Sequence, residues 1–314
     1  MRVIFMGTPE FSVGVLRALK EAEHEVVLAV TQPDKPKGRG EKYLYTPVKK
    51  EALDLGIPVF QPKRIRDAKA IELLSGYQAD VFVVVAFGQI LPQVILDLAP
   101  YGCINVHASL LPKYRGAAPI QWAILNGERV SGVTTMQMDA GLDTGDILQK
   151  KEMPLAKKET AGSLHDKLGA MGAELILETL DKLQTGKLIP QKQGESPTEY
   201  AKMITKEMGN IDWNFGANEI ERRIRGLSPW PSAYTYLDGK MLKIWEADVL
   251  DTKASTLPGT IEIIEKDAII VSTGKGMLRI KSLQLQGKKR MDADAFLRGN
   301  PLEISMTFER QGGV

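Results

Sequence analysis

The sequence predicts an α/β protein with a Rossmann-like, mostly parallel sheet covered by helices on both faces, followed by a smaller OB-like β-barrel domain. Apolar runs in the first half are continuous rather than alternating, which is typical of buried parallel strands. Segments with helical spacing separate several of these runs. The last third instead holds short β-rich runs broken by turn signals, as in a small barrel.

The predicted sheet begins with a strand at residues 3–6, after which Gly7 marks a turn and apolar residues recur at helical spacing. A long amphipathic helix is expected over 161–183. The other strands are expected at 26–30, 81–85, 103–106, 130–138 and 147–153, with a helix at 47–55. Because no helical stretch separates the last two strands, the sheet is predicted to be mixed at that end.

A polar stretch with glycines and prolines follows the long helix and marks the predicted domain boundary. We predict a catalytic domain over residues 1–188, a linker over 189–206 and a C-terminal β-barrel domain over 207–314. Turn signals such as Asp238-Gly239 separate the short β runs of that domain. These runs lie at 234–237, 242–247, 259–264, 268–272 and 277–285.

The composition limits the classes of function. The 41 basic and 39 acidic residues give a net charge of only +2, so any RNA-binding surface must be a local patch. The single cysteine, Cys103, excludes an intramolecular disulfide and a multi-thiolate zinc site. No apolar stretch approaches the ~20 residues of a membrane-spanning helix, and the first apolar run is too short for a signal peptide. We expect a cytoplasmic protein.

The turn after the first strand, Gly7-Thr8-Pro9, argues against dinucleotide binding. A G-x-G-x-x-G fingerprint counted from Gly7 needs glycines where this chain has Pro9 and Ser12. Pro9 also lacks the backbone N–H that a phosphate cradle would use. Neither an NAD site nor a P-loop is expected.

Asn105 and His107 end a buried strand and are the first candidates for chemistry. Side chains alternate along a strand, so both project from one face while Val106 projects from the other. Ligands gather at the carboxyl ends of strands in an open parallel sheet. There an amide donor can stabilise a developing oxyanion and an imidazole can move a proton. The alternative is a buried histidine with satisfied hydrogen bonds and a strand-end asparagine.

The acidic, glycine-spaced loop 139–146 lies between two predicted strands. A calcium loop of the EF-hand type starting at Asp139 needs a glutamate at its twelfth place, where Lys150 stands. A solvated hairpin turn is the ordinary alternative. If the loop folds over the strand end, one of its aspartates can orient and charge-stabilise His107.

Several blocks accompany these residues between positions 7 and 231. They are Gly7-Thr8-Pro9-Glu10-Phe11, Thr31-Gln32-Pro33-Asp34, Ser109-Leu110-Leu111-Pro112-x-Tyr114-Arg115-Gly116, Ala117-Ala118-Pro119-Ile120, Asp143-Thr144-Gly145-Asp146 and Pro229-Trp230-Pro231. In this combination the chain resembles the folate-dependent formyltransferase family, and most closely its members that formylate methionine on initiator tRNA.

The resemblance implies that Asn105, His107 and Asp143 are a catalytic trio. The implied reaction is attack by an α-amine on the formyl carbon of 10-formyltetrahydrofolate, through a tetrahedral intermediate that the trio stabilises. No metal and no obligate protein partner are implied. The residues implied to contact the folate are Ser109, Leu110, Leu111, Pro112, Phe87, Gly88, Ile90, Leu91 and Asp139.

The resemblance also implies a contact between initiator methionyl-tRNA and the basic stretch that starts at Asp34, which we expect to lie outside regular structure. Arg39 is its best candidate contact. The other candidates are Lys35, Lys37, Lys42 and Lys206, and Lys49, Lys50, Arg222, Arg223, Arg225, Lys288, Lys289 and Arg290 could extend the track. The C-terminal domain is expected to bind tRNA.

Two other functions stay open at this point. The same trio could serve formyl transfer to a small amine, such as a purine precursor or an amino sugar, although a purine-pathway enzyme would leave the C-terminal barrel unexplained. A non-catalytic RNA-binding protein is the other alternative, and it would make the polar trio a coincidence.

Overall fold

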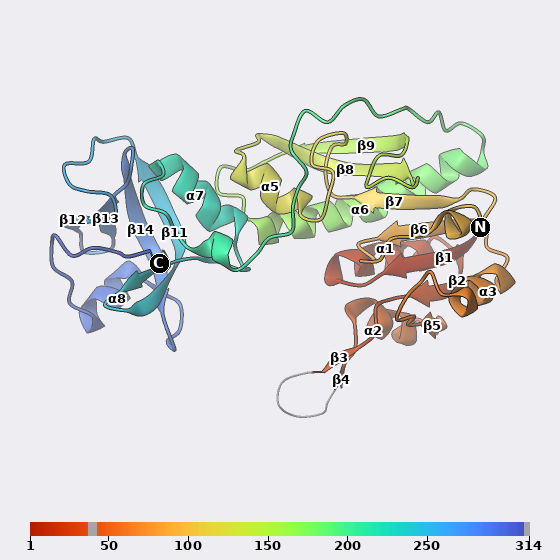
Figure 1. Cartoon of the computed structure of the whole chain (residues 1–314), viewed down its shortest axis with the longest axis horizontal. Helices are drawn as coiled ribbons and strands as arrows, with labels where there is room; N and C mark the ends of the chain where they lie inside the picture. The colour runs from red at the N-terminus through yellow and green to blue at the C-terminus, as the bar shows by residue number, and fades with distance from the viewer. Residues whose placement is uncertain (37–42, 311–314) are drawn as a thin grey trace. The chain divides into compact units, whose positions relative to one another are not determined.

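The computed structural model describes residues 1–36 and 43–310 (Figure 1). Contacts divide the chain into two compact units. Unit 1 comprises Met1–Pro119, Val130–Pro154 and His165–Ala201, and unit 2 comprises Ile120–Arg129, Leu155–Leu164 and Lys202–Val314. The segment predicted as a linker therefore contributes residues up to Ala201 to unit 1. The domain limits at 188 and 207 stay predictions.

Unit 1 is built on a seven-stranded sheet with the order β5-β2-β1-β6-β7-β8-β9. The strands are β1 (Arg2–Gly7), β2 (Glu25–Val30), β5 (Val59–Phe60), β6 (Val81–Val85), β7 (Cys103–His107), β8 (Val130–Gln137) and β9 (Ile147–Pro154). The pairings from β5 to β7 are parallel, whereas β7–β8 and β8–β9 are antiparallel. The Rossmann-like, mostly parallel sheet with a mixed end is confirmed.

Helices connect these strands along the chain. They are α1 (Glu10–Glu21), α2 (Pro47–Asp54), α3 (Ala68–Gly76), α4 (Gln93–Leu96), α5 (Pro119–Leu125) and α6 (Ala161–Gln184). Helix α5, apart from Pro119, and the first turn of α6 belong to unit 2. Helix α2 begins where its sequence favours a start, because Pro47 needs no N–H there and the Thr46 hydroxyl accepts from Lys49 N at 3.2 Å. In the described part of the chain, no helix is both long and apolar enough to cross a membrane.

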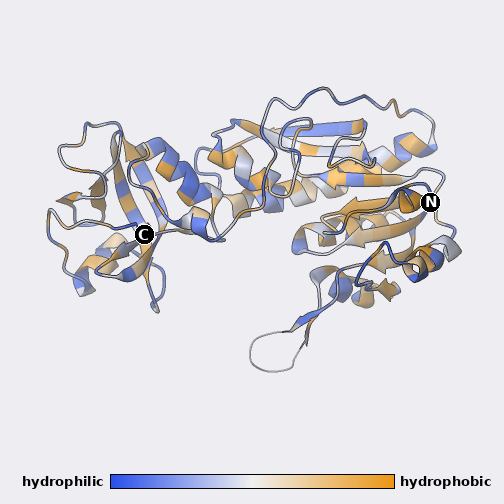
Figure 2. Cartoon of the chain, in the orientation of Figure 1, coloured by the Kyte–Doolittle hydropathy of each residue, from blue (hydrophilic) through white to orange (hydrophobic). Residues whose placement is uncertain are grey.

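The apolar strands of unit 1 account for its core (Figure 2). Ile4, Met6, Leu28 and Phe82 project from one face of the sheet and pack in one core cluster with α3 and α4. Helix α6 lies against the other face, where a Cβ on Gly172 would stand 2.9 Å from the Val106 side chain. A glycine at this place therefore lets α6 approach β7 closely.

One prediction about the basic stretch was wrong at its start. Lys35–Pro36 forms a short strand, β3, that pairs antiparallel with β4 (Tyr43–Leu44). The pairing requires only two residues on each side, which is too short for a hydrophobic pattern to reveal.

Unit 2 contains an antiparallel sheet with the order β10-β11-β14-β13-β12. Its elements are β10 (Ala233–Leu237), β11 (Lys240–Leu250), β12 (Ile261–Ile264), β13 (Ile269–Ser272), β14 (Met277–Leu285), β15 (Met291–Asp292), α7 (Ala217–Gly226), α8 (Ala293–Gly299) and the 3₁₀ turn Glu207–Gly209. The helix α7 packs mainly on β11, with Ile220 and Ile224 buried in the core of the unit.

The segment after α8 joins the two outer strands of this sheet. Tyr236 of β10 and Glu309 exchange backbone hydrogen bonds of 3.0 and 2.9 Å. At the other side, Ile261 of β12 donates to Met306 O at 2.8 Å and accepts from Ser305 N at 2.9 Å. Phe308, between these contacts, is buried in the core. The last described residues thereby close the sheet into a barrel-like form.

Candidate active site

Strand β7 carries Asn105 and His107 to the carboxyl edge of the sheet in unit 1. In register, Asn105 lies beside Met136 and His107 beside Thr134 of β8. Val106 faces α6 on the other side, as strand alternation requires. Asn105 and His107 therefore lie on the sheet face that packs against α3 and α4, at the edge of that apolar core.

The side chain of His107 is only 7% exposed and has two polar neighbours. Its Nε2 lies 3.0 Å from the carbonyl oxygen of Tyr114. Its Nδ1 lies 3.9 Å from Oδ1 of Asp143, which is an ion-pair distance when the ring is protonated. The structure thus brings the histidine and the loop aspartate together, although they are distant in the chain.

Asp143 is oriented by the backbone around it. Its Oδ2 accepts a hydrogen bond of 2.9 Å from Gly116 N, and its own φ of 56° lies in the left-handed region. That conformation costs an aspartate less than most residues but still needs support from its surroundings. One carboxylate oxygen is therefore held by the backbone and the other faces His107.

The rest of the acidic loop is shaped by Asp139 and two glycines. Oδ1 of Asp139 accepts from Gly141 N at 3.0 Å and from the Thr144 hydroxyl at 2.8 Å. A Cβ on Gly145 would stand 1.8 Å from the Gln137 carbonyl oxygen, so only glycine fits there. Asp139 has a structural role in the loop, and its contact with folate stays a prediction.

The Ser109–Pro112 segment is pinned to the neighbouring strands. The Thr134 hydroxyl donates to Ser109 O at 2.7 Å and accepts from Leu111 N at 3.1 Å. Lys150 Nζ donates to Leu111 O at 2.7 Å. Leu111 is fully buried, whereas Leu110 and Pro112 are partly exposed.

The Phe87–Leu91 loop follows β6 at the same edge. Gln89 accepts from Ile65 N at 2.7 Å and donates to Pro62 O at 3.1 Å, which anchors the loop. Phe87 and Leu91 are buried in the core, whereas Ile90 is 76% exposed and Gly88 adopts a φ of 84°. Of the predicted apolar wall, Ile90 is accessible and Leu91 is a core residue.

Sequence reasoning missed Arg115, Gln193 and Thr198, which surround the site. Tyr114 N donates to the Thr198 hydroxyl at 2.8 Å, and Arg115 donates to Gln193 Oε1 at 3.0 and 2.9 Å. Arg115 belongs to the block Ser109–Gly116 on which the family resemblance rests, but its partner Gln193 lies in a polar stretch without periodicity. No local sequence pattern shows that this polar stretch lies next to the candidate active site.

Cys103, deeper in β7, is a packed thiol. Burial raises its pKa to about 12, with a smaller contribution from the Asp97 carboxylate. The reactive form of a cysteine is the thiolate, so this side chain is inert at physiological pH.

The residues predicted to contact tRNA fall into three groups. Lys37, Arg39 and Lys42 lie outside the described residues, while Lys35 and Lys206 are exposed. Lys49 pairs with Asp34 at 2.5 Å. Burial alone would raise the pKa of Asp34, but hydrogen bonds from Lys49 and Gln61 outweigh it and lower that pKa.

The arginines of α7 differ from one another in their contacts. Arg225 pairs with Glu221 at 2.7 Å, and Arg223 pairs with Glu219 at 3.2 Å. In contrast, Nε of Arg222 is buried and has no hydrogen-bond partner in the described part of the chain.

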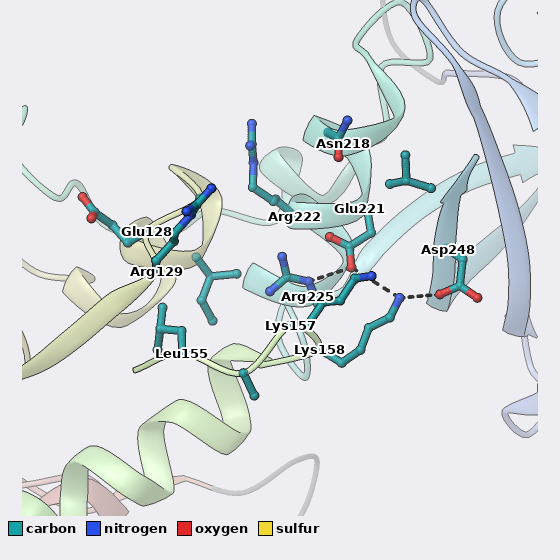
Figure 3. Close-up of a pocket in the computed structure, with 14 residues that line it drawn as sticks. Glu128, Arg129, Leu155, Lys157, Lys158, Asn218, Glu221, Arg222, Arg225 and Asp248 are labelled. Carbon is teal, nitrogen blue, oxygen red and sulfur yellow. Dashed lines mark hydrogen bonds and ion pairs between the residues drawn. The ribbon is translucent and has the colours of Figure 1, made fainter. Parts of the chain in front are cut away.

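Arg222 lines a cavity of about 750 Å³ within unit 2 (Figure 3). Five cations and three carboxylates line it, together with apolar side chains. Lys158 bridges Glu221 and Asp248, at 3.7 and 2.5 Å, so it is neutralised. The cations of the lining outnumber its carboxylates by two, so the cavity carries a net positive charge. The residues of this cavity that carry charge are Glu128, Arg129, Lys157, Lys158, Glu221, Arg222, Arg225 and Asp248.

Comparison with known families agrees with this architecture. The model described as "Formyl transferase" matches residues 1–180, and the model described as "Formyl transferase, C-terminal domain" matches residues 203–301. The chain belongs to the formyl transferase family. The family resemblance predicted from the sequence blocks is thereby confirmed.

This formyl transferase has similar relatives over nearly its whole length. It is 58% identical over 308 residues to the methionyl-tRNA formyltransferase of Agathobacter rectalis, which covers 98% of this chain and 99% of the relative. It is 55% identical over 311 residues to that of Lachnospira eligens, with the same coverage. A protein this similar to known formyltransferases is an enzyme of that kind.

Among solved structures, the formyl transferase resembles WlaRD, a sugar 3N-formyl transferase crystallised in the presence of dTDP and 5-N-formyl-THF. The TM-score is 0.67 at 21% identity, covering 92% of this chain and 99% of that chain. At this identity the likeness concerns the fold.

Proposed function

We propose that this enzyme transfers a formyl group from 10-formyltetrahydrofolate to the α-amino group of methionine on initiator tRNA, using Asn105, His107 and Asp143. The identity to methionyl-tRNA formyltransferases over 98% of the chain supports the reaction and the acceptor. The observation that most directly supports this catalytic site is the approach of Asp143 to His107 at the carboxyl edge of the sheet.

The reaction exchanges one C–N bond of the formyl carbon for another. The amine nitrogen forms the new bond, the folate nitrogen leaves, and the proton that the amine loses ends on the leaving nitrogen. The side-chain amide of Asn105 donates to the formyl oxygen, where negative charge develops. His107 moves the proton, and Asp143 stabilises the imidazolium while it exists.

Two loops at the same edge fit a folate. Ile90 offers an exposed apolar side chain on an anchored loop, and the Ser109–Pro112 segment is rigidly held by Thr134 and Lys150. A flat heterocycle with polar edges suits such a combination of an apolar wall and fixed backbone groups. The folate supplies the activated formyl group when it is bound.

The tRNA contacts follow from charge. By resemblance, Arg39 and its neighbours Lys35, Lys37 and Lys42 contact the acceptor stem, with Lys206 further along the chain. Arg222 suits a backbone phosphate, because it lines the unit 2 cavity and its buried Nε has no hydrogen-bond partner among the described residues (Figure 3). Arg129 and Lys157 line the same cavity and could extend this contact. Arg223 and Arg225 are less suited, since both are paired within α7.

The decisive experiment compares acceptors. The purified chain is given 10-formyltetrahydrofolate with methionine-charged initiator tRNA or, separately, with free methionine, an amino sugar or a purine precursor amine. We expect formylated product only with the charged tRNA. Formylation of a small amine at a comparable kcat/KM would overturn the acceptor, and no formylation of any acceptor by the folded protein would overturn the activity.

A further inference from the structure

Gln193 uses its whole side-chain amide to connect two loops of the candidate active site. Its Nε2 donates to the carbonyl oxygens of Asp143 and Gly145, at 3.0 and 2.7 Å. Its Oε1 accepts from Nε and Nη2 of Arg115, at 3.0 and 2.9 Å. A side-chain amide has two donor hydrogens and one acceptor oxygen, so each polar atom of this side chain is used.

Together with Gly116, these contacts form a closed ring of hydrogen bonds around Asp143. Arg115 is adjacent to Gly116, whose N–H donates to the carboxylate of Asp143 at 2.9 Å. The backbone of Asp143 returns to Arg115 through Gln193. The aspartate is therefore held at both ends, with its carboxylate fixed by Gly116 and its main chain fixed by Gln193.

The segment that carries Gln193 is itself fastened to both loops. Gln191 and Ile147 exchange backbone hydrogen bonds of 2.8 Å each, which anchors one end beside the acidic loop. At the other end, Ala201 N donates to Arg115 O at 2.8 Å. The short span between these two anchors leaves Gln193 little freedom to move away from the loops.

Asp143 needs such support. Its φ of 56° is a conformation that a free loop would not hold stably, and its Oδ1 lies 3.9 Å from Nδ1 of His107, beyond hydrogen-bond distance. A small rotation of the loop would lengthen that distance further. Gln193 opposes the rotation because its Nε2 donates hydrogen bonds to the backbone carbonyl oxygens of Asp143 and Gly145, on both sides of Thr144.

We propose that Gln193 is a positioning residue for the formyl transfer, acting through Asp143 to hold the carboxylate against His107. This inference rests on the role proposed above for Asp143. Gln193 lies outside the trio and within the stretch predicted as a linker. At metal sites, removal of a residue that orients a ligand indirectly typically costs 10- to 100-fold in activity, and we expect a loss of about 10-fold or more here.

The test is a double-mutant cycle with Asp143. Gln193→Met keeps the volume of the side chain and removes its hydrogen bonds, while Gln193→Glu keeps an acceptor for Arg115 and removes the donors to the loop. We expect Gln193→Met to lower kcat by about 10-fold or more, with KM for both substrates changed by less than about 2-fold. Gln184→Met, the same substitution at an exposed glutamine that ends α6, should leave kcat unchanged.

The cycle separates positioning from general stability. If Gln193 acts through Asp143, the double variant Gln193→Met/Asp143→Asn will be no slower than Asp143→Asn alone. If the losses of kcat in the two single variants multiply in the double variant, the proposal is overturned. A normal kcat in a folded Gln193→Met protein would also overturn it. If Gln193→Met does not fold, the same cycle is run with Gln193→Glu. A normal kcat for Asp143→Asn would instead contradict the proposed role of the aspartate itself.

Discussion

Nε2 of His107 lies 3.0 Å from the carbonyl oxygen of Tyr114, and this contact decides which ring nitrogen carries a proton. A carbonyl oxygen only accepts, so Nε2 must donate. The other ring nitrogen, Nδ1, faces Asp143. The two neighbours therefore contact different nitrogens of the ring and fix its orientation.

We predict that His107→Ala lowers kcat by ~100-fold or more, as loss of a positioned acid–base group typically does. The matched control is His165→Ala, since His165 is a partly exposed histidine of the same unit that pairs with Asp166. Steady-state formylation and thermal unfolding are measured for both variants. A folded His107→Ala protein with near-normal kcat would remove His107 from the mechanism.

We predict that Arg222→Ala raises KM for charged tRNA by about 3- to 10-fold and leaves kcat unchanged, because a lost phosphate contact weakens binding without touching the chemistry. The slope of log KM against log salt should also become shallower. Arg298→Ala on α8 is the control, since its guanidinium is exposed and pairs with Asp294. Equal effects of the two substitutions would contradict a specific contribution from the cavity.

We predict that the stability contributed by Glu262 depends on pH. Burial alone would raise its pKa, but hydrogen bonds from Ser272, Ser255 and Thr256 outweigh burial and lower the pKa to about 2. Because the folded-state pKa is depressed, the contribution is complete above the ordinary value of 4.5 and is lost as pH falls toward 2.

The corresponding measurement is denaturant unfolding of Glu262→Gln between pH 2 and pH 7. After allowance for solvent screening, we expect a loss of about 1 to 2 kcal/mol near neutral pH that shrinks as the solution is acidified. Asp267→Asn is the control, because the Asp267 carboxylate is exposed where it pairs with Arg279, and its loss should cost less than ~0.5 kcal/mol. A pH-independent difference would contradict the assignment.

We predict that Cys103 does not react with thiol reagents in the native protein at pH 8, because its thiol is buried and its pKa is raised to about 12. One thiol should become reactive after unfolding, and Cys103→Ala should keep its kcat within about 2-fold. Rapid labelling of the native protein, with loss of activity, would show that the strand opens near the site.

Much of the fold could be predicted because the strands of unit 1 are continuous apolar runs. The register could not be predicted, and it is the register that places Thr134 beside His107. The short strands of unit 2 were expected, whereas its closure through residues 305–309 was not. That segment alternates too briefly to be distinguished from a loop.

In the candidate site, too, some features could be predicted from the sequence and others could not. Asn105 and His107 could be placed on one face from strand alternation, but their approach to Asp143 depended on how a loop folds. Ile90 and Leu91 are equally apolar in sequence, and only the packing shows that Leu91 is buried while Ile90 is exposed. The hydrogen bonds of Gln193 span 48 to 78 positions, and no local pattern encodes them.

The closure of unit 2 by its last described residues has a consequence for truncated forms. A chain that stops before Ser305 would lose the partners of Tyr236 and Ile261, together with the buried ring of Phe308. Strands β10 and β12 would then present free N–H and C=O groups to solvent, which is a template for intermolecular pairing. Loss of residues 305–314 should therefore cause aggregation, even though unit 1 keeps every group that we assign to the chemistry.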